Sequence, residues 1–94
     1  MAKLTENAIA AALASLPGWS RAGEALTKTY KFPTFLDGIH FVDRVALTAE
    51  ELGHHPDITI NYWRVTMTLT THDEGGISDK DVTLAQRIDA LAQG

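Results

Sequence analysis

The alternation of apolar and polar residues in the segment 58–72 changes phase in its middle, and this change restricts how the segment can fold. The apolar residues are even-numbered in the first half, at Ile58 and Ile60, but odd-numbered in the second half, at Val65 and Met67. Successive side chains of a β-strand point to opposite faces of a sheet, so one straight strand would place the two sets on opposite faces. The phase change therefore predicts either a hairpin or a bulged strand.

A β-hairpin with its tip at residues 62–63 brings both apolar sets onto one face. In this register Ile60 pairs with Val65 and Ile58 pairs with Met67, so that the numbers of paired residues sum to 125. The tip lacks the glycine that is usual in tight hairpins, and a single bulged strand is the alternative. We favour the hairpin because it makes one apolar face from both sets.

Two shorter segments carry the apolar spacing of amphipathic helices and begin with capping residues. Thr5 is expected to cap a helix over residues 6–16, and Ser78 a helix over residues 79–93. Asp81 occupies the third position of the latter helix, where it would complete a capping box as a structural cap, although Glu or Gln is commoner there.

The longest predicted helix runs from Thr34 or Asp37 to Leu52, with Gly53 as its C-terminal stop. Its apolar residues form a broad stripe that requires a large packing partner, and a sheet face is the natural candidate. The residues of this stripe are Phe35, Ile39, Val42, Val45, Ala46, Ala49 and Leu52.

Residues 19–21 and 25–32 predict another hairpin around a three-residue loop, although Lys28 interrupts the apolar face of its second strand. The predicted order of elements is α-β-β-α-β-β-α. This order indicates the α+β class, with a single layer of four-stranded antiparallel sheet and three helices on one face. With 94 residues and 10.2 kDa, the chain is expected to form one domain over residues 1–94.

Charge and cysteine content exclude several classes of function. Eight Lys and Arg are outnumbered by twelve Asp and Glu, and the basic residues are scattered singly, so we expect no direct binding to nucleic acid. The absence of cysteine excludes disulfides and thiolate metal sites, and it favours the cytoplasm over secretion. No apolar run approaches ~18 residues, so no membrane span is predicted.

The histidines are the strongest candidates for chemistry. In the predicted register His72 lies opposite Gly53 and beside His54, so that His54, His55 and His72 converge at one end of the sheet. Pro56 restricts His55 to extended backbone, which fixes the direction of its side chain. Because imidazole gains and loses protons near neutral pH, the three rings form a candidate acid/base cluster.

A zinc or iron site is the rival use of three histidines. Adjacent His54 and His55 tend to point apart on extended backbone, so we expect no metal. Glu50 lies four residues before His54 on the last helical turns, where it could orient a ring or a ligand, or else belong to a solvated helix face.

A widely spaced set of residues resembles the signature of the pterin-4a-carbinolamine dehydratases. The members of this set are Glu50, His54, His55, Pro56, Tyr62, His72 and Asp81. The likeness extends to Gly18-Trp19 after the first helix and to Thr71-His72, which leads into Gly-Ile-Ser-x-x-Asp, so it covers essentially the whole chain.

The resemblance implies a four-stranded antiparallel sheet with helices on one face, and it implies an enzyme. The family dehydrates a 4a-hydroxytetrahydropterin to the quinonoid dihydropterin, which recycles tetrahydrobiopterin for aromatic amino-acid hydroxylases without a metal or organic cofactor. It implies that His54 and His72 donate protons and that His55 binds and orients the substrate. Glu50 and Pro56 would complete the pocket.

Two more residues are expected in the substrate-binding set, and two further expectations concern partners. Thr71 and Trp19 join this set, although a tryptophan is more often a core or interface residue than a ligand platform. Family members form homodimers and homotetramers, and a small domain gains buried surface by self-association. Some relatives also act as dimerisation cofactors of homeodomain transcription factors, so a non-catalytic protein-binding role is the alternative function.

Overall fold

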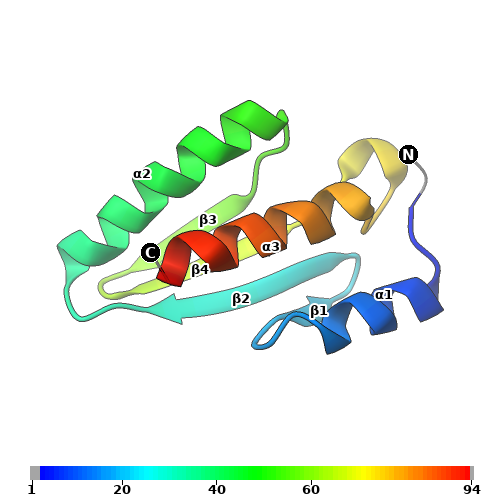
Figure 1. Cartoon of the computed structure of the whole chain (residues 1–94), viewed down its shortest axis with the longest axis horizontal. Helices are drawn as coiled ribbons and strands as arrows, with labels where there is room; N and C mark the ends of the chain where they lie inside the picture. Colours follow the sequence, from blue (N-terminus) through cyan, green and yellow to red (C-terminus); the bar gives the residue numbers. More distant parts are fainter. Residues whose placement is uncertain (1–2, 94) are drawn as a thin grey trace.

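The computed structural model describes residues 3–93, and within that range it contains three α-helices and four β-strands in the predicted order (Figure 1). The elements are α1 (Glu6–Ala14), β1 (Ser20–Ala22), β2 (Ala25–Lys31), α2 (Phe35–Leu52), β3 (Asp57–Asn61), β4 (Arg64–Leu69), the short 3-10 turn η1 (His72–Glu74) and α3 (Asp79–Gln93). The predicted α+β class is confirmed.

The strands form one antiparallel sheet in the order β1-β2-β4-β3. The predicted hairpin is confirmed in its register, because Ile58 pairs with Met67 and Ile60 pairs with Val65. Tyr62 takes the left-handed backbone conformation, with φ of 54°, that a glycine usually supplies at such a tip. The bulged single strand is thereby excluded.

The two faces of the sheet differ in character. Helices α2 and α3 lie side by side over one face, and α1 lies beside β1, to which Glu6 is joined by an ion pair with Arg21 (Figure 1). The covered face carries the fully buried side chains of the core, among them Leu26, Val65, Met67 and Leu69. The opposite face carries threonines, whose hydroxyls meet across the central strands in the pairs Thr27–Thr68 and Thr29–Thr66.

Helix α2 begins and ends at predicted residues, and its buried face includes Val45 and Ala49 of the predicted stripe. The Thr34 side chain accepts a hydrogen bond at the helix start, and Gly53 ends the helix with φ of 64°. The predicted stripe is partly wrong, because Phe35 and Ala46 are exposed whereas Phe41 is fully buried. The helix packs on β4 through the face around Phe41, so apolar residues on the neighbouring face remain in contact with solvent.

Two predicted boundaries are also corrected. Helix α1, capped by Thr5 as predicted, ends at Ala14 rather than at residue 16, because the N–H of Ser15 bonds to Ala12 in a tighter turn. The loop between β1 and β2 has two residues rather than three, since Ala22 already pairs with Ala25. No helix within residues 3–93 is long and apolar enough to cross a membrane.

Lys28, which interrupts the apolar face of β2, has a partner on α3. Asp89 Oδ1 accepts hydrogen bonds from Lys28 Nζ at 2.9 Å, from the Tyr30 hydroxyl at 2.5 Å and from Trp19 Nε1 at 3.1 Å. Burial, together with the bond to Asp89, raises the pKa of Tyr30 far above its usual range, so its hydroxyl remains a donor. One carboxylate thus joins α3 to β2 and to the segment after α1.

Asp89→Ala should destabilise the protein by about 2–3 kcal/mol, because three partly buried donors lose a charged acceptor. Urea denaturation followed by circular dichroism measures this loss. Asp43→Ala is the matched control, because Asp43 is exposed on α2 and should change the unfolding free energy by less than about 0.5 kcal/mol. Equal stability of the two variants would contradict the assigned role of Asp89.

Candidate active site

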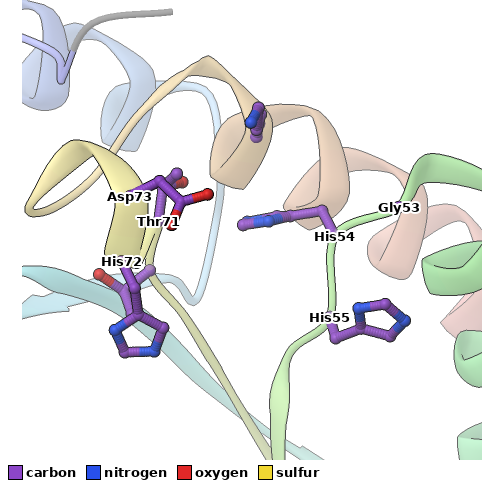
Figure 2. A pocket seen from close by; sticks show the side chains of 8 residues that line it. Gly53, His54, His55, Thr71, His72 and Asp73 are labelled. Atoms are coloured by element: carbon purple, nitrogen blue, oxygen red, sulfur yellow. The ribbon is translucent and has the colours of Figure 1, made fainter.

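An open cleft of about 250 Å³ lies where the segment after α2 faces the segment after β4 (Figure 2). Its walls are formed by Gly53, His54, His55, Thr70, Thr71, His72, Asp73 and Lys80. The left-handed turn at Gly53 ends α2, and the hairpin register, continued past its last pair Asp57–Thr68, places residues 53–55 opposite residues 70–72. The fold therefore brings the three predicted histidines to the same cleft.

His54 is held by a buried carboxylate. Its Nε2 lies 2.5 Å from Asp81 Oδ1, and the two side chains are 13% and 0% exposed. The ring extends from the irregular segment between Gly53 and β3 toward the η1 side of the cleft (Figure 2). Such a carboxylate fixes the orientation of the ring and stabilises the imidazolium that forms when the ring gains a proton.

The other oxygen of Asp81 completes the predicted capping box. Asp81 Oδ2 accepts hydrogen bonds from the Ser78 N–H at 3.0 Å and from the Thr71 hydroxyl at 2.9 Å. Ser78 Oγ in turn accepts from the Lys80 N–H at 3.2 Å. Asp81 therefore caps α3 and also positions His54, and we predicted only the first of these roles from the sequence. Two signals pointed to the second role: an Asp where Glu or Gln is commoner, and the place of Asp81 beside the histidines in the signature-like set.

The hydrogen bonds around Asp81 determine the tautomer of His54. Because an ionised carboxylate can only accept, the hydrogen bond to Asp81 requires the proton of the neutral ring to lie on Nε2. The Nδ1 atom is then the position of His54 that can take up or release a proton during a reaction.

His55 is oriented differently from His54. Its Nε2 hydrogen bonds to the Glu50 carboxylate, and the ring is turned away from His54 and His72 (Figure 2). Both partners are largely exposed, at 61% and 76% of the side chain. Pro56 follows and is half-buried, outside the residues that form the cleft walls. His55 and Glu50 thus form a polar pair at the rim of the cleft.

His72 begins η1 and forms part of the opposite wall (Figure 2). It is exposed, and its side chain makes no hydrogen bond with residues 3–93. Its ring is therefore free to meet a ligand, whereas that of His54 is fixed.

The polar side-chain atoms of the remaining predicted binding residues, Thr71 and Trp19, are hydrogen-bonded within the protein. Thr71 belongs to the cleft wall, but it is buried and its hydroxyl is bonded to Asp81 and Ser78. Trp19 does not reach the cleft, because it is buried in the core and bonded to Asp89, roughly 12 Å along α3 from Asp81. Within residues 3–93, no group of three His, Cys, Asp or Glu side chains is arranged to hold a metal ion.

Comparison with known proteins gives a consistent result. The family model described as pterin 4 alpha carbinolamine dehydratase matches residues 2–91. Two similar proteins are provisionally named pterin-4-alpha-carbinolamine dehydratases. The protein from Thermomicrobium roseum is 51% identical over 98% of this chain and 99% of its own, and that from Mycobacteroides abscessus is 55% identical over 95% of each.

Two solved structures are similar as well. A transcriptional coactivator/pterin dehydratase from Brucella melitensis has a TM-score of 0.92 and 39% identity, and the match covers 96% of this chain and 98% of that one. A pterin dehydratase-like protein described as a RuBisCO assembly factor in the alpha-carboxysome has a TM-score of 0.68 and 31% identity, with 80% of this chain and 89% of that one covered.

Neutral His54 should carry its proton on Nε2, because Asp81 accepts a hydrogen bond there. Nitrogen-15 NMR of the imidazole rings distinguishes the two tautomers. His40, which is exposed on α2 without a side-chain partner among residues 3–93, provides the unconstrained reference. A neutral His54 ring with its proton on Nδ1 would contradict the assigned geometry.

Proposed function

The chain belongs to the pterin-4a-carbinolamine dehydratase family, and on this premise we propose that it is a hydro-lyase that converts a 4a-hydroxytetrahydropterin to the quinonoid dihydropterin. The observation that carries the proposal is that a histidine lies on each of the two facing walls of the cleft. His54, held by buried Asp81, and His72, free of side-chain bonds to the described residues, border one cleft. A role limited to protein binding would not require this arrangement.

The proposed reaction requires an acid and a base on either side of a flat ring. The C4a–O bond breaks, and the oxygen takes a proton from the acid and leaves as water. The lone pair of N5 forms the C4a–N5 double bond, and the N5 proton passes to the base. Imidazole suits both steps, because it exchanges protons near neutral pH. The reaction needs no metal or organic cofactor.

The environments of the histidines support different roles. His54 exchanges a proton through Nδ1, while Asp81 stabilises the ring when it is charged. His72 acts from the facing wall. His55, together with Glu50, binds the polar edge of the pterin at the rim. Thr71 shapes the wall through its bonds to the capping box, and Pro56 directs the chain into β3.

We further propose that the reaction recycles tetrahydrobiopterin for an aromatic amino-acid hydroxylase in the cytoplasm. The alternative is a non-catalytic role as a cofactor of a protein partner, in line with the coactivator and assembly-factor descriptions of the two structural relatives. Dehydration of freshly generated 4a-carbinolamine by the purified protein distinguishes the two, since a pure binding protein would leave the spontaneous rate unchanged.

His54→Ala and His72→Ala should each lower kcat by roughly 10²-fold or more, the usual contribution of acid–base catalysis. The double variant should lose more than either single one. His55→Ala should mainly raise KM, because it removes binding that is equal in the ground and transition states. His40→Ala is the matched control and should retain full activity. Wild-type activity in a folded His54→Ala/His72→Ala protein would contradict this mechanism.

We also propose that the protein forms homodimers or homotetramers. Large apolar side chains are exposed on α2 and at the β3–β4 tip, including Leu47, which is 70% exposed, and Tyr62. Their burial between copies would enlarge the small core of a 10.2 kDa chain.

Light scattering at micromolar concentration should therefore give a particle larger than 10.2 kDa. Leu47→Glu should lower the mass, because it places a charge in the apolar surface of α2, whereas Gln86→Glu adds the same charge on α3 and should not. A wild-type particle of 10.2 kDa would contradict self-association.

A further inference from the structure

Two buried hydroxyl groups, those of Ser78 and Thr71, lie on the side of Asp81 that faces away from His54. Asp81 Oδ1 contacts His54, whereas Oδ2 accepts from the Thr71 hydroxyl at 2.9 Å. The oxygens of the Thr71 and Ser78 hydroxyls are 2.7 Å apart. Ser78 and Asp81 are 0% exposed and Thr71 is 4% exposed, so this network is closed to bulk solvent.

The chemistry of these groups fixes the direction of each hydrogen in the network. An ionised carboxylate only accepts, so the hydrogen of the Thr71 hydroxyl points to Asp81. The bond between the two hydroxyls therefore uses the hydrogen of Ser78, which donates to Thr71 Oγ1. Ser78 Oγ in turn accepts from the Lys80 N–H at 3.2 Å. We call the two hydroxyls, joined in this order and directed at Asp81 Oδ2, the hydroxyl chain.

The backbone holds both members of the hydroxyl chain in place. Thr71 and Gly76 exchange N–H···O bonds in both directions, at 3.0 and 3.2 Å. Lys3 pairs with Ser78 in a second isolated β-bridge. Ser78 also precedes α3, whose first N–H groups have no acceptor within the helix, so the chain begins at the positive end of the helix dipole. Each of these features favours hydrogens that point toward the carboxylate.

We propose that Ser78 and Thr71 are positioning residues for the dehydration, an inference that rests on the proposed function. The hydroxyl chain keeps Asp81 an acceptor, and this leaves Nδ1 of His54 free to exchange a proton. Among residues 3–93, the ion-pair partner of Asp81 is His54 alone. On the side away from His54, hydrogen bonds therefore supply all the stabilisation of this buried charge.

Loss of the hydroxyl chain would permit the opposite arrangement of the same pair. A buried carboxylate with fewer donors takes up a proton more readily, because burial favours its neutral form. A neutral Asp81 would donate to Nε2 of His54, and the proton of the ring would then lie on Nδ1. In that tautomer Nδ1 has no free lone pair, so His54 could not act as the base.

Thr71→Val removes one hydroxyl of the chain and preserves the shape of the side chain. It should lower kcat by about tenfold, the usual effect of losing a hydrogen bond to a charged group, and should change KM by less than about threefold. Thr71→Ser restores the hydroxyl and should recover most of the lost kcat. Thr48→Val is the matched control, because Thr48 is 7% exposed on α2 and its hydroxyl makes no hydrogen bond with residues 3–93. Its kcat should stay within about twofold of the wild-type value.

Ser78→Ala tests whether the two hydroxyls act as one unit. On its own it should lower kcat less than Thr71→Val does, because it weakens the chain but leaves the donor to Asp81 in place. In the Thr71→Val background it should have no further effect on kcat, since the chain is already broken. Losses that multiply would overturn the proposal, because they indicate two independent structural effects. Urea denaturation followed by circular dichroism confirms that each variant is folded.

The tautomer of His54 provides a readout that needs no catalysis. In Asp81→Asn, the Thr71 hydroxyl and the Ser78 N–H hold the amide oxygen at the position of Oδ2, so the amide nitrogen faces His54. That nitrogen only donates, and nitrogen-15 NMR should therefore show the proton of the neutral ring on Nδ1. The signals of His40 should not change. A His54 ring that keeps its proton on Nε2 in this variant would overturn the inferred direction of the hydroxyl chain.

The outcomes separate this inference from the proposed function. Absence of dehydration by the wild-type protein would contradict the proposed function, and the NMR comparison of wild type with Asp81→Asn would still test the hydroxyl chain. Wild-type kcat in a folded Thr71→Val protein would overturn the inference and leave the dehydratase intact. A tenfold loss that Thr71→Ser does not recover would overturn it as well, because the hydroxyl would then not be the group that matters.

Discussion

The carboxylate of Asp81 is the contact on which the arrangement of the site depends. It accepts hydrogen bonds from the start of α3, from Thr71 at the end of the sheet and from His54 after α2. His54 lies 27 residues from Asp81 in the sequence, whereas the other two groups lie within ten, and the carboxylate is fully buried among them. A buried donor or acceptor without a partner lowers the stability of the fold, so each of these contacts favours the others. The cleft therefore forms together with the cap of α3.

Much of this architecture could be predicted from local patterns. The phase change between Ile60 and Val65 restricted the segment to a hairpin or a bulged strand, and the favoured hairpin is the one observed, with both apolar sets on one face. The register then implied that His72 would face the end of α2, where Gly53 turns the chain. Backbone periodicity and capping chemistry thus predicted where the histidines meet, since both depend on residues close in sequence.

The directions of side chains could not be predicted in the same way. The pairing of His54 with Asp81 depends on how α3 crosses the sheet, and the pairing of His55 with Glu50 depends on the rotation of the last turn of α2. The burial of Phe41 in place of Phe35 has the same origin. These contacts follow from the placement of helices on the sheet, which apolar periodicity constrains to a broad face rather than to one angle.

The two carboxylates of α3 have a joint consequence for motion. Asp81 is joined to the cleft and Asp89 to β2, about two helical turns apart on the buried side of the helix. Apolar ridges alone would tolerate a slip along the axis or a small roll, since the contacts between them are not directional. Two directional anchors at separate heights oppose both movements, because either movement would break hydrogen bonds to Asp81 or Asp89. The position of helix α3 along the sheet is therefore set at two points, so that the segment after α1 and the wall that holds His54 are both referred to one helix.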